Sequence, residues 1–188
     1  MPSMESEPTN RLIAAALTAA RWHSAERRKG GAEEPYINHL LGVASLVSQA
    51  TGGKDIDVII AALLHDAIED QGISSATIAG QFGDDVASLV GEVTDDKSLP
   101  KAVRKRLQVE SAPKKSSRAK ILKLADKISN VTAIGKDPPS DWPIERQREY
   151  VQWGRDVVAG LRGASAQLKA QFDRTADEAE RLIDSRSG

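Results

Sequence analysis

The sequence contains no cysteine, and this absence excludes three kinds of chemistry. Without thiols the chain forms no disulfide, no zinc site built on thiolates and no cysteine nucleophile. It also lacks any apolar run near the roughly 20 residues that span a bilayer. Residues 1–10 are polar and acidic with no apolar h-region, so we expect no secretory signal. We therefore expect a cytoplasmic protein with no membrane partner.

Internal repeats, low-complexity linkers and alternating β-type patterns are also missing. What remains is a series of apolar periods typical of α-helices, separated by glycine and proline. With 188 residues, of which 40% are hydrophobic and 28% charged, the chain suits one domain with a sizeable core. We predict an all-α fold, with one compact helical domain over residues 10–188 after a loose tail over residues 1–9.

Capping residues and breakers predict where the helices begin and end. A first helix should follow a cap at Thr9 or Asn10, and a second should follow a cap at Asn38. A third, opened by Asp55 or Asp57, should continue unbroken to Asp70. Later helices are expected over about 75–82, 84–93, 100–111, 117–134, 144–161 and 164–184.

The third predicted helix carries the most informative stretch, IIAALLHDAIED at residues 59–70. Its six apolar residues leave no polar face, which indicates a helix buried on every side. On a continuous helix, His65 shares a stripe with Glu69, and Asp66 shares the next stripe with Asp70. A buried helix that brings together a histidine and three carboxylates must satisfy them, and a metal ion does so effectively.

A complete metal site needs ligands from elsewhere in the chain, which has only three histidines. His39 lies in the first turn of a predicted helix, and Asp126 lies beside the apolar face of a long one. With His65 and Asp66 they would form a site of two nitrogen and two oxygen ligands. Such ligands suit manganese, iron or zinc, and manganese especially where water and phosphate fill open positions. Considered singly, a histidine near an apolar face is more often hydrogen-bonded than a metal ligand, and an aspartate at a helix end is usually on the surface.

Charge is distributed unevenly along the chain, although the net charge is only −1. Residues 54–96 hold ten acidic side chains and one basic, whereas residues 97–127 hold eleven basic and two acidic. One segment could therefore bind cations and the other anions. The alternative is two solvated surfaces of opposite sign.

The motifs together resemble those of a known family. His39, the His65-Asp66 pair and Asp126 match the H…HD…D signature of HD-domain phosphohydrolases. Further segments resemble the hydrolase domain of the RelA/SpoT group, especially stand-alone small alarmone hydrolases of the metazoan SpoT-homologue type, over roughly residues 10–170. These segments are Arg27-Arg28-Lys29, Pro35-Tyr36-Ile37-Asn38-His39, His65 to Asp70, Phe82-Gly83, Val93 to Lys97 and Lys123 to Lys127.

The resemblance implies an HD-domain helical bundle that hydrolyses the 3′-pyrophosphate of (p)ppGpp with a manganese ion, giving GDP or GTP and pyrophosphate. No synthetase domain fits in the remaining residues. Spacing and resemblance together assign Glu69 as the general base or water-orienting group and Asp70 as its partner. The loop from Gly30 to Glu34 is more acidic than the resemblance leads us to expect. This difference could change how the purine base of the nucleotide is bound.

Substrate contacts are expected from the basic segment and its neighbours. The residues that match nucleotide-binding positions of the family are Arg28, Lys29, Lys101, Asn130, Arg146 and Tyr150. Lys101 starts a helix, which favours an anion, and Arg146 and Tyr150 lie four apart on one helix. Tyr36 or an arginine could lie on the purine face. Considered singly, a surface lysine or arginine is more often a solvated charge than a phosphate contact.

Three other functions remain open at this point. The same pocket chemistry would serve a phosphohydrolase of another phosphorylated nucleotide, such as NADPH or an adenosine alarmone. A non-catalytic nucleotide sensor is a second possibility, which the intact acidic and histidine residues disfavour. Nucleic-acid binding through residues 97–127 is disfavoured because that segment has no aromatic residue to stack on bases. The expected partner is therefore a small nucleotide, and the oligomeric state is left open.

Overall fold

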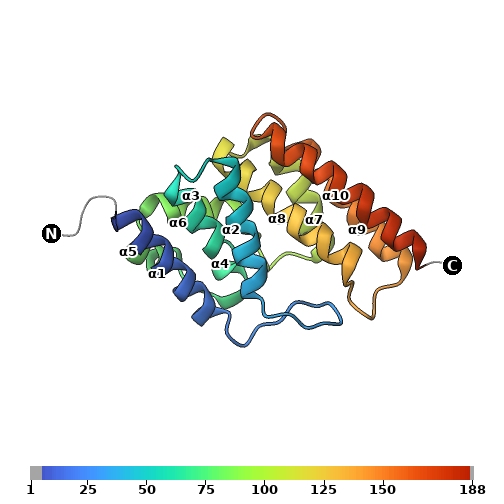
Figure 1. The fold of residues 1–188 in the computed structure, drawn as a ribbon, viewed down its shortest axis with the longest axis horizontal. Coiled ribbons are helices and arrows are strands. Elements are labelled where there is room, and N and C mark those ends of the chain that lie inside the picture. Colours follow the sequence, from blue (N-terminus) through green and yellow to red (C-terminus); the bar gives the residue numbers. More distant parts are fainter. Residues whose placement is uncertain (1–5, 187–188) are drawn as a thin grey trace. The chain divides into compact units, whose positions relative to one another are not determined.

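The computed structural model describes residues 6–186, and within this range the regular secondary structure is helical, with no β-strand. The helices are labelled in Figure 1. Their bounds are α1 (Ser6–Trp22), α2 (Ile37–Ala50), α3 (Ile56–Leu64), α4 (Ala67–Gln71), α5 (Ser75–Phe82), α6 (Asp84–Val93), α7 (Lys101–Ser111), η1 (Ala112–Lys114), α8 (Ser117–Lys136), α9 (Ile144–Ala159) and α10 (Ala166–Ser185). The all-α prediction is confirmed.

The chain divides into two compact units. Unit 1 takes in the described residues up to Glu26 together with Pro35–Asp96, and it contains α1 to α6. Unit 2 consists of the loop Arg27–Glu34 and the described residues from Lys97 onward, with α7 to α10. None of the helices in the described range has the length and apolar composition needed to cross a bilayer.

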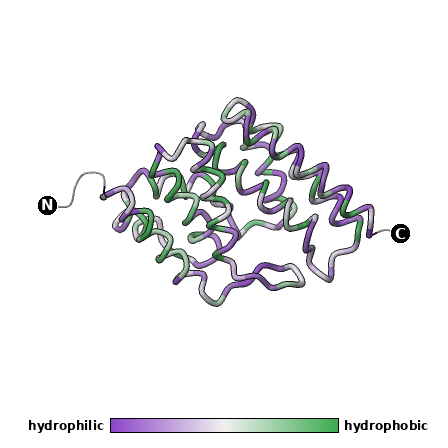
Figure 2. Tube along the Cα trace, in the orientation of Figure 1, coloured by the Kyte–Doolittle hydropathy of each residue, from purple (hydrophilic) through white to green (hydrophobic). Residues whose placement is uncertain are grey.

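Helix α3 is the centre of unit 1. Its residues from Val58 to Leu64 are all buried, and it packs against α1, α2 and α6. In Figure 2 its segment is coloured as hydrophobic. The predicted burial on every side is confirmed, and so is one of the predicted caps, because the Asp55 carboxylate accepts the Val58 N–H at 3.2 Å. Ser74 caps α5 in the same way.

The prediction of one continuous helix through Asp70 is wrong. Helix α3 ends at Leu64, and His65 and Asp66 form a turn before α4 begins at Ala67. The cause is a side-chain hydrogen bond, because His65 Nδ1 lies 2.8 Å from the carbonyl oxygen of Ala62 in the last turn of α3. Such bonds compete with the backbone ladder and end a helix.

The first two helices also begin at other residues than predicted. Helix α1 starts at Ser6, ahead of Thr9 and Asn10, with Glu7 in its first turn, where a negative charge is favourable. The part of the predicted tail from Ser6 is therefore helical, and residues 1–5 lie outside the described residues. Helix α2 has Tyr36 at its N-cap without a side-chain cap, so the predicted cap at Asn38 is wrong.

Helix α8 is the centre of unit 2 and packs against α9 and α10. It begins as predicted at Ser117, after a cap by Ser116, which accepts the Ala119 N–H at 3.2 Å. The close approach of α8 to α10 requires glycine at position 135, because a Cβ there would lie 2.8 Å from the Cα of Ala179.

The loop Arg27–Glu34 is attached to the end of α8. The carboxylate of Asp137 accepts the backbone N–H groups of Gly31 and Ala32 at 2.9 and 3.0 Å. Position 30 must be glycine for this contact, since a Cβ there would collide with the backbone carbonyl and the carboxylate of Asp137. Arg28 and Lys29 are thereby held in unit 2, although α2 follows the loop directly in sequence.

Candidate active site

Two buried imidazoles and one carboxylate converge within unit 1. His39, in the first turn of α2, and His65, after α3, have side chains only 1% and 4% exposed. Their ring centroids lie 5.2 Å apart in an edge-on arrangement. The Nε2 atoms lie 3.5 Å (His39) and 3.1 Å (His65) from the same oxygen, Asp66 Oδ2. Three potential ligand atoms, one from α2 and two from the turn between α3 and α4, therefore face one point.

The hydrogen bond between His65 and Ala62 also sets the tautomer of the imidazole. A backbone carbonyl only accepts, so Nδ1 of His65 carries a hydrogen, and Nε2 is the ring nitrogen that faces Asp66 and is left for a metal ion. Histidines that bind metals are oriented in this way, with the second ring nitrogen donating to a carbonyl or carboxylate. The break in the helix that sequence analysis did not predict is therefore part of the site.

Asp66 is held in its ionised form. Burial raises the pKa of this carboxyl, but the neighbouring imidazoles of His65 and His39, when protonated, lower it by more, so the pKa lies well below its ordinary value. The Tyr36 hydroxyl donates a hydrogen bond to Asp66 Oδ2 at 2.8 Å. Two imidazole nitrogens and an ionised carboxylate fit a divalent transition-metal ion.

Helix α4 carries the two predicted catalytic carboxylates, one turn beyond Asp66. Burial raises the pKa of Glu69, and the nearby negative charges of Asp95, Asp66 and Asp70 raise it further. Glu69 Oε2 also accepts the backbone N–H of Asp95 at 3.3 Å. A carboxylate with a raised pKa beside potential metal ligands is suited to accept a proton from water.

The fourth predicted ligand, Asp126, is buried on α8 in unit 2. Asn130, one turn later, donates from Nδ2 to Asp126 Oδ1 at 2.6 Å. Lys127 Nζ lies 3.4 Å from Oδ2. Arg28 donates in turn to Asn130 Oδ1 at 3.0 Å, so three predicted site residues form one chain of hydrogen bonds. This chain fixes the orientation of the Asp126 carboxylate.

Two predicted phosphate-binding cations lie against one aromatic ring in unit 2. Arg146 Cζ lies 4.2 Å and Lys101 Nζ 5.6 Å from the ring centroid of Trp142. Burial lowers the pKa of Lys101, and the positive charges of Arg146, Lys29 and Arg104 lower it further. Cations that repel each other in this way gain when an anion binds among them.

Tyr150 and Trp153 form an aromatic cluster with Trp142. The ring centroid of Tyr150 lies 5.6 Å from that of Trp142 and 5.2 Å from that of Trp153. Lys105 Nζ lies 4.8 Å from the Trp153 ring and 5.9 Å from the Tyr150 ring. Trp142 and Trp153 are not among the predicted site residues, and Lys105 was expected to be a solvated charge or a source of general attraction for a polyanion. The available signal was spacing, because Lys105 follows Lys101 by one helical turn and Trp142 precedes Arg146 by four residues.

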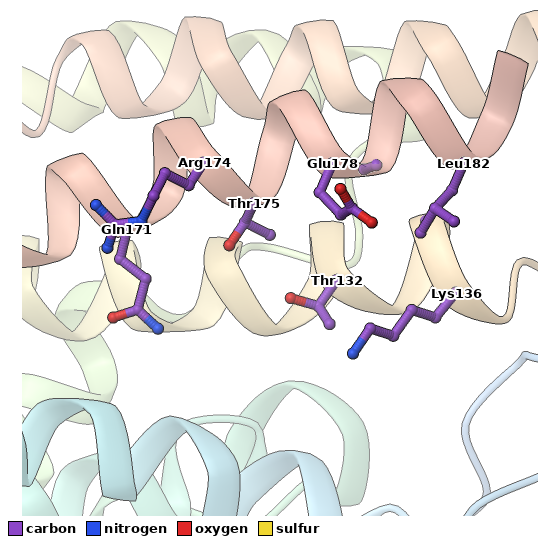
Figure 3. A pocket seen from close by; sticks show the side chains of 9 residues that line it. Thr132, Lys136, Gln171, Arg174, Thr175, Glu178 and Leu182 are labelled. Atoms are coloured by element: carbon purple, nitrogen blue, oxygen red, sulfur yellow. The ribbon is translucent and has the colours of Figure 1, made fainter.

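A groove between α8 and α10 shows where unit 2 has space but no predicted site residue. It has a volume of about 330 Å³, and Figure 3 shows Thr132, Lys136, Arg174 and Glu178 among the side chains along it. As far as the described residues define its lining, the groove includes none of the predicted metal, catalytic or substrate-binding residues.

The helical fold and the His39, His65-Asp66 signature define an HD-domain protein. Residues 15–166 match the family described as HD domain, and the chain belongs to this family, whose members are metal-dependent. The predicted family resemblance is confirmed.

Among its relatives are proteins named guanosine-3′,5′-bis(diphosphate) 3′-pyrophosphohydrolase MESH1. The chain is 47% identical to that of Xenopus tropicalis, with 86% of this chain and 90% of the relative covered. It is 48% identical to that of Homo sapiens, with 84% and 88% covered. A solved structure of a metazoan orthologue of SpoT, described as hydrolysing ppGpp, matches with a TM-score of 0.85 and 42% identity, over 93% of this chain and 95% of that one.

Proposed function

We propose that this chain is a metal-dependent hydrolase of guanosine alarmones, which converts ppGpp or pppGpp into GDP or GTP and pyrophosphate. The observation that carries the proposal is the convergence of His39 Nε2, His65 Nε2 and Asp66 Oδ2, one turn before a glutamate with a raised pKa. The names of the relatives, at 47% and 48% identity over most of the chain, support the substrate class.

In this proposal the metal is held by His39, His65, Asp66 and Asp126. We propose Mn²⁺, because two nitrogen and two oxygen ligands leave positions for water and phosphate, which suit this ion. A bound divalent ion would polarise a phosphoryl oxygen and lower the pKa of its water towards neutrality. The bond from Asn130 supports the role of Asp126, since it aims the carboxylate.

Glu69 acts in this mechanism as the general base. Its raised pKa increases its affinity for the proton that the attacking water loses. Asp70 follows it on α4 and orients the same water, and the Tyr36 hydroxyl lies 3.4 Å from Asp70 Oδ2. Water then attacks the phosphorus that is bonded to the ribose 3′-oxygen, and the bond between that phosphorus and the 3′-oxygen breaks. The water oxygen becomes part of the released pyrophosphate, and the 3′-oxygen takes up a proton from solvent to give GDP or GTP.

The phosphates of the substrate are bound, in this proposal, by Arg28, Lys29, Lys101 and Arg146, with Asn130 and Tyr150 beside them and Tyr36 near the purine. Two of these cations are supported by an aromatic ring, which restricts their long side chains. The partner is thus a free nucleotide rather than a nucleic acid or a membrane. We also propose a cytoplasmic location, which imaging of a tagged chain tests.

A substrate and metal panel tests the proposal. The protein is stripped of metal, reloaded with Mn²⁺, Zn²⁺ or Mg²⁺, and given ppGpp, pppGpp, NADPH or an adenosine alarmone. We expect fastest pyrophosphate release from a guanosine alarmone with Mn²⁺. Turnover of NADPH at an equal rate contradicts the substrate assignment. Tight ppGpp binding without release of pyrophosphate supports the sensor function instead.

A pair of arginine variants tests the phosphate contacts within unit 2. Arg146→Ala removes a cation beside Trp142, whereas Arg174→Ala removes one from the groove between α8 and α10. We expect KM for ppGpp to rise about tenfold in the first, the equivalent of about 1.4 kcal/mol. The second should leave KM unchanged. Equal effects of the two substitutions contradict the proposed phosphate site.

A further inference from the structure

A hydrogen-bonded group of side chains connects the end of α1 to the end of α4. His23, which follows α1, has a fully buried side chain, and its Nδ1 lies 2.6 Å from Glu26 Oε2. Gln71, the last residue of α4, donates from Nε2 to the same oxygen at 2.7 Å. Because two donors share one carboxylate oxygen, the C-terminal end of α4 is bound to the turn after α1.

Tyr36 holds the other end of α4. Its hydroxyl donates to Oδ2 of Asp66, the N-cap of α4, at 2.8 Å. Its ring is stacked on the His23 imidazole, with centroids 5.2 Å apart and planes at 16°. Its backbone N–H donates to the carbonyl oxygen of Glu26 at 3.1 Å. The two attachments of α4 are therefore themselves joined, through the backbone and through the stacked rings.

Helix α4 depends on such attachments because it is very short. It has five residues, and isolated helices shorter than about 12–15 residues are marginal in water. Its N-cap, Asp66, is nevertheless a proposed metal ligand, and the helix carries Glu69 and Asp70. Small rotations of α4 would therefore change the aim of all three carboxylates.

The choice of histidine at position 23 fits this role better than a purely apolar core residue would. A carboxylate only accepts, so Nδ1 carries the hydrogen that Glu26 receives. The second nitrogen, Nε2, is buried and has no hydrogen-bond partner within the described residues. A buried ring with one unsatisfied atom is unfavourable as filling alone. It is explained if the other nitrogen must anchor Glu26.

We propose that His23, Glu26, Tyr36 and Gln71 form an α4 clamp, a set of positioning residues that fixes the Asp66 carboxylate at one end and the Glu69–Asp70 pair at the other. The proposal rests on the proposed function for the roles of those carboxylates. It gives Tyr36 a role distinct from purine stacking, since one face of its ring is covered by His23.

Two variants separate the two ends of the α4 clamp. Tyr36→Phe removes only the hydroxyl and keeps the ring on His23. We expect it to weaken Mn²⁺ binding to the metal-free protein by about 10- to 100-fold, the usual effect of losing a partner of a ligand. The kcat for ppGpp should fall with it, while KM stays the same. Gln71→Ala should lower kcat about tenfold and change Mn²⁺ affinity by less than about twofold, because Asp66 remains held.

Gln49→Ala is the matched control, since Gln49 lies exposed on α2 and its side chain donates to Ser45, one turn earlier on the same helix. It should leave Mn²⁺ affinity, kcat and KM unchanged. Circular dichroism and denaturant midpoints of all three variants check that each is folded before its binding is compared.

The outcomes separate the α4 clamp from the proposed function. Calorimetric titration with Mn²⁺ needs no substrate, so a weakened Tyr36→Phe variant supports the clamp even if the wild type does not hydrolyse ppGpp. Wild-type Mn²⁺ affinity and kcat in Tyr36→Phe overturn it. A rise in KM alone also overturns it, because that result assigns Tyr36 to the purine. Absence of Mn²⁺ binding in the wild type overturns it as well.

Discussion

Replacing Glu69 by glutamine separates proton transfer from the other properties of the site. Glutamine has the same length, and its side-chain carbonyl can still accept the Asp95 N–H that Glu69 accepts at 3.3 Å. The amide cannot take a proton from water near neutral pH. Because Glu69 is not a proposed ligand, Mn²⁺ affinity and KM for ppGpp should stay as in the wild type.

General-base catalysis sets the size of the expected loss. A positioned base contributes about 100- to 10,000-fold to a rate, so kcat of Glu69→Gln should fall within that range. At about 1.36 kcal/mol for each factor of ten, the barrier rises by about 2.7 to 5.4 kcal/mol.

The folding stability of Glu69→Gln should rise, although its kcat falls. Burial and then Asp95 raise the pKa of Glu69 above that of an unfolded glutamate, so the fold disfavours its ionised form. Stability of the wild type therefore falls as pH rises through the raised pKa. Glutamine removes this penalty, and the variant should gain at most about 1 kcal/mol near neutral pH, because Glu69 is partly exposed and screened. Below the ordinary pKa of glutamate the difference should vanish.

Pyrophosphate release under single-turnover conditions measures the first effect, and denaturant unfolding of the metal-free protein measures the second. A variant that keeps more than a tenth of wild-type kcat refutes Glu69 as the base. A variant that unfolds more easily than the wild type at neutral pH refutes the electrostatic reasoning.

Three further outcomes are expected. Asp95→Asn should move the acidic limb of the kcat–pH profile to lower pH, because a negative charge that raises the pKa of the proposed base is lost, and an unmoved limb contradicts this. Gly135→Ala should lower the free energy of unfolding by about 1–3 kcal/mol, since its Cβ would lie 2.8 Å from the Cα of Ala179. Gly42→Ala, whose added Cβ would have nothing within 4 Å, should instead raise the free energy of unfolding by up to about 1 kcal/mol. Equal unfolding midpoints for the two variants contradict both expectations. Lys105→Met should raise KM for ppGpp about tenfold at unchanged kcat, and a wild-type KM excludes this lysine from phosphate binding.

Features set by local chemistry were predictable from the sequence. The apolar run of α3 and its cap at Asp55 depend on residues within one turn of each other, and both are confirmed. The caps at Ser74 and Ser116 follow the same rule. The pairing of His65 with Asp66 is also adjacent in sequence, which is why its chemistry could be inferred before the fold was known.

Features that depend on a specific tertiary contact were not predictable. The break after Leu64 requires the bond from His65 to the Ala62 carbonyl, and no residue pattern distinguishes it from a continuous helix. The third histidine, His23, could not be assigned a role from the sequence. Its proposed role in the α4 clamp depends on Tyr36 and Gln71, which come from other segments.

The aromatic part of unit 2 illustrates the same limit. Trp153 donates from its indole nitrogen to the backbone carbonyl of Lys105 at 3.0 Å, a contact between residues 48 positions apart. Sequence spacing alone relates Lys105 to Lys101, but it does not bring Lys101 to the ring of Trp142 or Lys105 to the rings of α9. The charge asymmetry was visible in the sequence, whereas the rings that organise it were visible only in the fold.

Phosphorus NMR of ppGpp incubated with the Mn²⁺-loaded protein tests the central claim most directly. The signals of GDP and inorganic pyrophosphate should appear together in equal amounts, neither should appear with metal-free protein, and Glu69→Gln should form both at least about 100-fold more slowly. Stepwise release of orthophosphate, or unchanged ppGpp beside saturated Mn²⁺ binding, would contradict the assignment of a 3′-pyrophosphohydrolase.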